Sequence, residues 1–331
     1  MADNVYVVKE ILEKAFKKGA VIELLNRRIS HEGFVECGIP MGCTSLIVAM
    51  IFARPQTVSL LLEYGADPKC VDAGGIDGFV HGVRAGSLDS ARVWIKCVKT
   101  FNVNTLLRGS TCIAECVRFG SINATSSVKF LIDECNADPS ILVKDGSSAL
   151  LVACGNEDAS LELIMLLLQV SPAHFLNTPR RSPSLKYRIF QWCAKKLVSF
   201  NLTSSTIAKD MSKCAGHLAL HAAVQRGDYD IVRLLLKNGA NPNVENDHGL
   251  NAIEICKRDG PFPEILGMLR KCVQKKSSTV SSNSKRLMQH MTSKSILDDT
   301  FPHGSTPSDE EWFSDDSVYL NKTPTLESVA S

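Results

Sequence analysis

The chain has 331 residues, of which 44% are hydrophobic and 22% are charged, so it contains enough apolar material for a packed core. Its formal net charge of +2 favours neither a nucleic-acid-binding protein nor an acidic tether. The 12 cysteines include no Cys-x-x-Cys pair, so neither a zinc site nor a dense disulfide framework is indicated, and a reducing compartment is favoured.

The N-terminal part of the chain contains two segments with apolar residues at helical spacing, residues 7–18 and 21–28. We expect residues 1–38 to form a helical N-terminal cap. No basic stretch followed by an apolar core is visible at the N-terminus, so we expect no secretory signal. The longest apolar runs, residues 45–53 and 161–170, are shorter than the roughly 20 residues that cross a bilayer. The interpretation is a soluble protein of the cytoplasm or the nucleus.

A glycine recurs along the chain at a nearly constant spacing. An apolar residue stands four positions after each glycine, and a small residue stands three positions further on, which is one face of a short helix. The glycines are Gly42, Gly75, Gly109, Gly146, Gly216 and Gly249. The gap from Gly146 to Gly216 is twice as long as the others, and we interpret it as two units.

A second apolar run follows each of four of these segments, and residues 231–236 are one example. Three such runs end in similar tetrapeptides, and Gly239 in the last of them suits the left-handed end of a helix. The tetrapeptides are Gly65-Ala66-Asp67-Pro68, Asn136-Ala137-Asp138-Pro139 and Gly239-Ala240-Asn241-Pro242. The repeating unit is therefore predicted to be a pair of helices.

Residues 216–246 carry the clearest motif. Leu218-Ala219-Leu220-His221-Ala222-Ala223 resembles the Thr-Pro-Leu-His-x-Ala opening of an ankyrin repeat, and the glycine spacing resembles the period of that family. The resemblance covers roughly residues 40–270 and implies an all-α ankyrin-repeat α-solenoid of helix-turn-helix units with hairpin loops. Repeats 1–4 are expected in residues 39–177, and repeats 6 and 7 in residues 214–273. Thr44, Thr111 and Ser148 are expected to cap first helices.

The resemblance implies that partners bind to the concave helix face and to the tips of the loops. Candidate contacts on the loop tips are Asp72, Lys144, Asp145, Glu245, Asp247 and His248. The alternative for any one of them is an ordinary solvated loop residue, because few interface positions carry most of the binding energy.

Residues 178–213 have the length of a repeat but lack its motif, so they are a divergent repeat or an insertion. The stretch from Leu163 to Ala208 contains no acidic residue. Arg180, Arg181, Arg188 and Trp192 could together anchor an acidic peptide, since arginine pairs with carboxylates and tryptophan buries a large area. The alternative is a buried aromatic core with a solvated basic face.

Residues 274–331 are rich in serine and threonine and have no apolar period, so we expect a disordered tail. Charge is segregated at this end of the chain: residues 265–296 hold seven Lys or Arg and no acid, and residues 297–331 hold eight Asp or Glu and one Lys. Ser308 precedes an acidic cluster and is a candidate phosphosite. The acidic part could also fold back on the basic residues 180–196.

Neither an enzyme nor a cofactor is predicted, because the chain contains no Gly-x-Ser-x-Gly, phosphate-loop or His-Arg-Asp motif. His217 and His221 are four positions apart but lack further ligands, so we expect no metal. The favoured function is a monomeric adaptor or scaffold that binds other proteins, without a small-molecule substrate, nucleic acid or membrane as partner. The alternatives are a nuclear or nucleic-acid-associated regulator and a ubiquitin-ligase adaptor.

Overall fold

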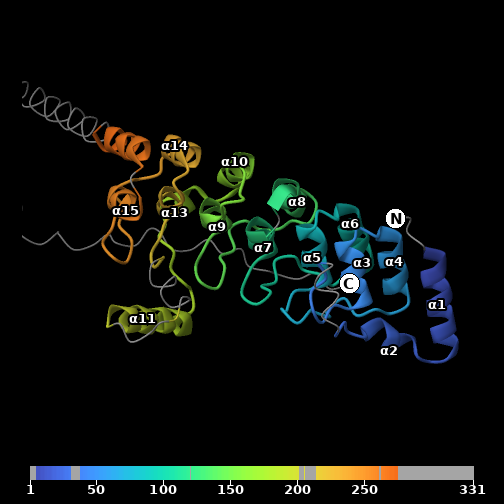
Figure 1. The fold of residues 1–331 in the computed structure, drawn as a ribbon. Coiled ribbons are helices and arrows are strands. Elements are labelled where there is room, and N and C mark those ends of the chain that lie inside the picture. Colours follow the sequence, from blue (N-terminus) through green and yellow to red (C-terminus); the bar gives the residue numbers. More distant parts are fainter. Residues whose placement is uncertain are drawn as a thin grey trace, which may run out of the picture. The chain divides into compact units, whose positions relative to one another are not determined.

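The structure, a computed structural model, describes residues 5–30, 38–119, 121–200, 205, 214–260 and 262–274. The expected tail and Ser308 therefore lie outside the described residues, apart from Gln274 at its start. Figure 1 shows that the described residues form short helices joined by loops. The helices are α1 (Val5–Lys17), α2 (Val21–Asn26), α3 (Ser45–Ile51), α4 (Pro55–Glu63), α5 (Gly78–Arg84), α6 (Leu88–Cys97), α7 (Cys112–Phe119), α8 (Ala124–Asp133), α9 (Ala149–Gly155), α10 (Leu161–Val170), α11 (Leu185–Ser199), α13 (Ala219–Arg226), α14 (Tyr229–Lys237) and α15 (Ala252–Asp259), with short 3-10 turns at η2 (Ser121–Asn123) and η3 (Ala173–Leu176). Residues 263–274 are also helical.

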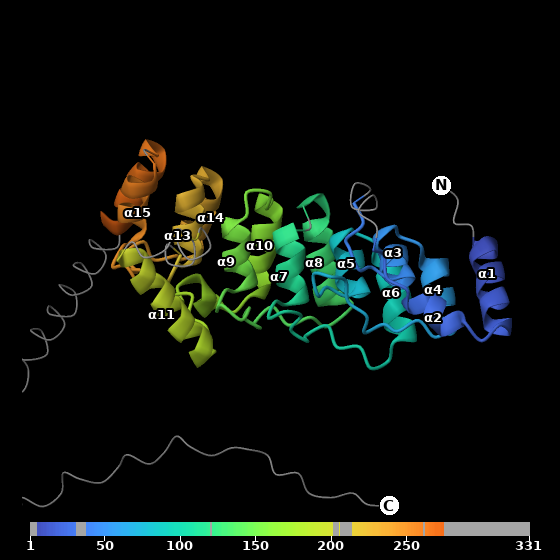
Figure 2. The same ribbon diagram turned by 60° about the horizontal axis from the view of Figure 1, so that its bottom comes forward.

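The first helices of successive units pack on one another in a single row. The contacts run from α3 to α5, α7, α9, α13 and α15 in turn, and each first helix but α15 also contacts the second helix of its own pair. Figure 2 shows the pairs side by side in chain order. The predicted helix-pair repeat is therefore confirmed, and α1 and α2 occupy the two segments predicted to be helical before the first pair.

The predicted apolar and small positions form the core between the pairs. Five of the six apolar residues four positions after a loop glycine are no more than 2% exposed: Leu46, Phe79, Ile113, Leu150 and Leu220. Ile253, in the last pair, is half-buried. The small position is buried in every pair, and at Gly82 an added Cβ would lie 2.6 Å from the Cε of Met50, so a larger residue cannot fit without repacking.

The six loop glycines all have positive φ, between 70° and 87°. An interior loop also lies close to the loop of the next unit. A Cβ on Gly146 would overlap the carbonyl group of Arg181, and one on Gly216 would stand 2.5 Å from the backbone nitrogen of Asp247. Glycine is thus needed here both for its left-handed backbone and for the close approach of the neighbouring loop.

The expected caps are present in two of three cases. Thr111 Oγ1 accepts from the N–H of Ala114 at 3.1 Å, and Ser148 Oγ accepts from that of Leu151 at 3.2 Å. Thr44 precedes α3, but its hydroxyl is buried without a hydrogen-bond partner among the described residues. Asp77, which replaces the hydroxyl in the second unit, caps α5 through Val80 N–H at 2.9 Å. The Asp77 carboxylate therefore caps α5 in place of a hydroxyl.

The packing at residues 178–213 disagrees with the expectation that the long gap between Gly146 and Gly216 holds two units. α9 packs directly against α13, so among the described residues no helix pair intervenes between them. In both ribbon views α11 lies on the side of the loops, away from the row of pairs. Direct packing of α9 on α13 is the arrangement that an insertion requires, because a divergent repeat would separate these helices.

The insertion leaves and rejoins the array through one hairpin. The N–H of Arg180 donates to the carbonyl of His217 at 2.9 Å, and Ser182 Oγ donates to the carbonyl of Lys144 at 2.5 Å. Residues 180–182 thus take the place beside Gly146 that the next loop takes elsewhere. The insertion therefore replaces the tip of the loop that precedes α13.

Candidate functional site

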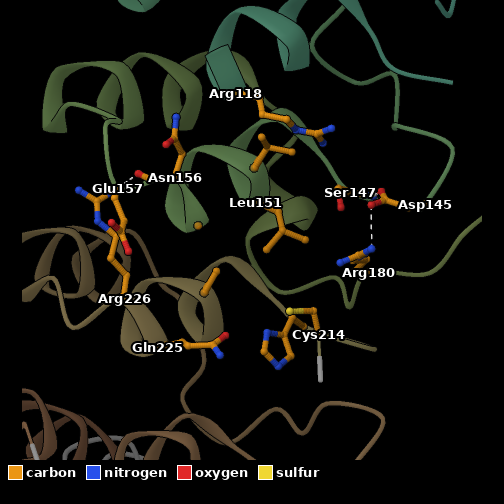
Figure 3. Close-up of a pocket in the computed structure, with 14 residues that line it drawn as sticks. Arg118, Asp145, Ser147, Leu151, Asn156, Glu157, Arg180, Cys214, Gln225 and Arg226 are labelled. Atoms are coloured by element: carbon orange, nitrogen blue, oxygen red, sulfur yellow. Dashed lines mark hydrogen bonds and ion pairs between the residues drawn. The ribbon is translucent and has the colours of Figure 1, made fainter. Parts of the chain in front are cut away.

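A pocket of about 540 Å³ opens on the face made by the first helices, where α9 meets α13 (Figure 3). We call the surface of α7, α9, α13 and the loops before them the first-helix face. The pocket is lined by Arg118, Asp145, Ser147, Leu151, Val152, Gly155, Asn156, Glu157, Arg180, Cys214, His217, Ala222, Gln225 and Arg226. Second helices contribute none of the residues that line it, so this pocket belongs to the first helices and their loops.

Arginines recur in the first helices at one position of the unit, nine positions after the loop glycine. That position is occupied by Arg84, Arg118 and Arg258 in the second, third and last units. Gly155 and Gln225 occupy it in the two units that form the pocket. The small glycine leaves space that a larger residue would fill, and the arginines beside it give the face a cationic character.

The insertion contributes one wall of the pocket. Arg180 pairs with Asp145, with Nη2 and Oδ2 2.7 Å apart, and both side chains are less than a fifth exposed. Figure 3 shows this pair at the loop end of the pocket. Asp145 is held in turn by the N–H of Ser147, which donates to its Oδ1 at 2.8 Å. The pair therefore joins the loop of the fourth unit to the start of the insertion.

Arg226 forms the opposite wall, between α9 and α13. Its guanidinium donates to the carbonyl of Asn156 and lies 3.2 Å from the carboxylate of Asp228. Figure 3 shows Arg226 reaching toward Asn156 and Glu157 across the gap between the two helices. Arg226 thus links the units of α9 and α13 through these contacts. The exposed Arg118 is better placed to contact a partner.

Two buried histidines lie next to each other, and one of them, His217, lines the pocket. His221 is 1% exposed; its Nδ1 accepts from the N–H of Leu218 at 3.4 Å, and its Nε2 faces the carbonyl of Val244 at 3.0 Å. His217 is 2% exposed, and its Nε2 has no hydrogen-bond partner among the described residues. Burial lowers the pKa of His217 to about 3 and that of His221 to about 4. Both are therefore neutral at physiological pH.

The structure gathers five of the ten predicted contact residues around the loop through which the insertion leaves. Lys144 and Asp145 meet Arg180 and Ser182, and Arg181 lies 3.9 Å from Asp247. Glu245 and His248 are exposed further along the loop that contains Asp247. Arg188 and Trp192 lie on α11. The prediction that these residues bind a partner stays a prediction.

Asp72 has a structural environment that differs from an open loop tip. It is 6% exposed; Oδ1 accepts from the N–H of Ile76 at 2.9 Å, and Oδ2 lies 2.8 Å from Nε2 of His81. A carboxylate with both oxygens engaged and little exposed surface has little left to offer a partner. We leave Asp72 out of the surface proposed below.

Sequence reasoning did not single out Arg118, Arg226 or Gln225. The sequence does contain a pattern that relates two of these residues, since Arg118 and Gln225 both stand nine positions after a loop glycine. Their convergence on one pocket could not be read from the sequence, because it depends on α9 and α13 being neighbours although α10 and the whole insertion lie between them in the chain.

Among the residues that the structure describes, no three His, Cys, Asp or Glu side chains gather as metal ligands would. Cys112 and Cys116 are both buried free thiols of α7. Among the helices of the same residues, none has the length and apolar character needed to cross a bilayer.

Residues 215–247 match the ankyrin repeat family, on the segment with the clearest motif. No curated protein matches the sequence significantly. The ankyrin repeat domain of Bcl-3, a unique member of the IkappaB protein family, matches the structure with a TM-score of 0.53 at 20% identity, over 81% of this chain and 93% of that chain. A chain from the complex of the predatory endopeptidase Bd0816 of Bdellovibrio bacteriovorus with the immunity protein Bd3460 matches with a TM-score of 0.49 at 18% identity, over 69% of this chain and 98% of that chain.

The row of helix pairs with hairpin loops defines an α-solenoid repeat protein. Residues 215–247 thus match an ankyrin repeat, and the array shares the fold of the ankyrin repeat domain of Bcl-3. The resemblance and the all-α fold class predicted from the sequence are thereby confirmed.

Proposed function

We propose that the protein is a non-enzymatic adaptor or scaffold that binds a partner protein through the first-helix face. The observation that carries this proposal is the open pocket between α9 and α13, which lies beside Arg118 and Gln225. Repeat arrays present such extended faces to partners, whereas chemistry needs a set of converging reactive groups. The proposed function is therefore protein binding without catalysis.

The chemistry of the face favours an acidic segment as the part of the partner that enters the pocket. Arg118, Arg180 and Arg226 line the pocket, and Arg84 lines a neighbouring pocket together with Arg118. Arg180 and Arg226 are already paired with Asp145 and Asp228, so the exposed Arg118 is the cation that a carboxylate of the partner would meet. A guanidinium can bind such a carboxylate with two parallel hydrogen bonds.

The test is quantitative affinity purification from native cells, in low and in high salt, with the full chain and with a chain ending at Gln274. A double variant, Arg118→Glu with Gln225→Glu, reverses the charge of the pocket without touching the ion pairs of its walls. Lys129→Glu, an exposed residue of the second helix α8, is the matched control.

We expect the same proteins to be lost with the double variant and retained with the control and with the shortened chain. Equal recovery with wild type and double variant would overturn the assignment of the face. Recovery that depends on residues after Gln274, or of nucleic acid that disappears in high salt, would move the function to the charged segments and support the nuclear alternative.

A further inference from the structure

Helix α11 is fixed to the array at two separate loops. Before the helix, Arg180 pairs with Asp145 and Ser182 Oγ donates to the carbonyl of Lys144. Within the helix, Nζ of Lys195 donates to the carbonyl of Asp247 at 2.6 Å. These anchors belong to the fourth unit and to the last unit, so α11 is held across the loops of both and has a defined orientation on the loop side of the array.

The side of α11 that faces away from these anchors is apolar and exposed. Ala194 is the one residue of the helix whose side chain is described as buried. Trp192 is 60% exposed and Phe200, which follows the helix, is 67% exposed. The remaining exposed apolar residues are Leu185, Ile189, Phe190 and Leu197. Such a group of large apolar side chains on a fixed helix is typical of an interaction surface.

The same surface is cationic. Helix α11 contains Lys186, Arg188, Lys195 and Lys196 and no acidic residue. Lys186 is exposed and has no ion-pair partner among the described residues, whereas Arg188 stands seven positions before the anchor Lys195 and so points toward the anchored side. Lys196 stands four positions after Trp192 and four before Phe200, and its Nζ lies 5.9 Å from the centre of the Trp192 ring. Apolar and cationic side chains are therefore interleaved rather than separated.

This alternation of apolar and cationic side chains distinguishes between the molecules that could bind to α11. A second copy of α11 would bring the cations of one copy against those of the other, which is repulsive. A bilayer would favour a continuous apolar face with the cations at its margins, and Lys196 interrupts the stripe between Trp192 and Phe200. A helical segment that carries acidic residues between apolar ones satisfies both parts of the surface, because its apolar residues cover the aromatic rings while its carboxylates meet Lys186 and Lys196.

We propose that α11 is a docking helix for an acidic amphipathic segment of a partner protein, on a surface separate from the first-helix face. The inference rests on the proposed function in so far as it takes the protein to be a binding protein. It adds a second contact of defined chemistry, supplied by the insertion and not by the repeats. A partner that engages both surfaces would bind more tightly than through either one, since the second contact forms at high local concentration.

The experiment uses the full chain and two synthetic, fluorescein-labelled peptides that form the same amphipathic helix from Leu and Ala, one with Glu and the other with Lys on its polar side. Fluorescence anisotropy measures the affinity of each. A Trp312→Phe background lets the emission of the exposed Trp192 report contact, because Trp94 is buried. We expect the Glu peptide to bind at least tenfold more tightly than the Lys peptide, with a blue shift of the Trp192 emission.

Two double variants test the surface. Ile189→Ser with Phe190→Ser removes apolar area, and Lys186→Glu with Lys196→Glu reverses charge; each double variant should lower the affinity for the Glu peptide at least tenfold. Lys129→Glu with Lys237→Glu, on the exposed sides of α8 and α14, is the matched charge control and should leave affinity unchanged. All of these residues are exposed, so circular dichroism and thermal unfolding should show an intact fold for every variant.

The outcomes separate the two proposals. Arg118→Glu with Gln225→Glu should leave the affinity for the Glu peptide unchanged, even if it abolishes recovery of cellular partners. If that variant lowers the affinity for the Glu peptide and the α11 variants do not, the peptide binds to the first-helix face and the inference about α11 is wrong. Equal binding of both peptides would also overturn it. Capture of phosphatidylcholine–phosphatidylserine vesicles without binding of the Glu peptide would identify α11 as a membrane contact instead.

Discussion

The side-chain oxygen of Asn177 accepts a hydrogen bond from the backbone N–H of Asn241 at 2.7 Å, across 64 residues of chain. Asn104 makes the same contact to the N–H of Asp138 at 2.8 Å, across 34 residues. Each asparagine also donates to the residue that begins the next tetrapeptide, Gly239 or Asn136. The same junction thus joins neighbouring units with and without residues 178–213 between them, so the array is continuous across the insertion.

Deleting the insertion should therefore leave the array folded. We expect a chain in which a short, glycine-containing turn replaces residues 183–213 to unfold within a few degrees of the wild type, because α9 and α13 already contact each other. Thermal unfolding followed by circular dichroism measures this. Asn177→Ala, which breaks the junction itself, is the contrasting variant and should cost about 1–2 kcal/mol. Loss of folding in the deletion would show that residues 183–213 complete the core.

Leu235 tests the register of the repeats. It is fully buried in α14, so Leu235→Ala should lower the free energy of unfolding by about 2–5 kcal/mol through the cavity it leaves. Asp247→Ala should change it by less than about 1 kcal/mol, because among the described residues the carboxylate makes a single ion pair, long and exposed, with Arg181. Urea unfolding of both variants gives the comparison, and equal effects would contradict the assigned register.

The loop glycines allow backbone strain to be separated from contact with the next unit. Gly249→Ala, at the open end of the array, should cost about 1–2 kcal/mol for the left-handed backbone alone, since φ is +70° and the nearest atom to an added Cβ is 3.8 Å away. Gly146→Ala has the same strain and also brings a Cβ into the backbone of Arg181, so it should cost about 1–3 kcal/mol more. Urea unfolding that gave equal costs would contradict the close stacking of the loops.

The buried histidines predict a loss of stability in mild acid. Their pKa values are lowered to about 3 and about 4 in the folded state, whereas the unfolded chain takes up these protons near pH 6.5. The unfolded state binds more protons below that pH, so stability is complete above about pH 6.5 and falls as the pH falls toward 4. The expected loss between pH 7 and pH 5 is about 1–2 kcal/mol for each histidine.

The free energy of unfolding at pH 7 and pH 5 measures this loss. His217→Gln should reduce the difference between the two pH values, whatever it does to stability at pH 7. His174→Gln, at an exposed position in η3, is the control and should keep the wild-type difference. A difference that is the same in all three chains would show that other groups cause the acid sensitivity.

The repeat itself could be predicted from the sequence, because its signals are local. Gly216 and Gly249 mark left-handed turns, and Leu220 and Ala223 stand on one face of a helix, which follows from the helical period of about 3.6 residues per turn. The helix pairs, the loop register and the family resemblance all rest on such short-range patterns. For the same reason the capping roles of Thr111 and Ser148 were predicted correctly.

The tertiary structure decided what depends on contacts between distant residues. The place of α11 outside the array follows from the packing of α9 on α13, which no spacing within residues 178–213 reveals. The pocket follows from the same packing, since Arg118, Gln225 and Arg180 come from three segments that meet only in space. Periodicity fixes which side of a helix is apolar, but which neighbour covers that side is set by burial of surface across the whole chain.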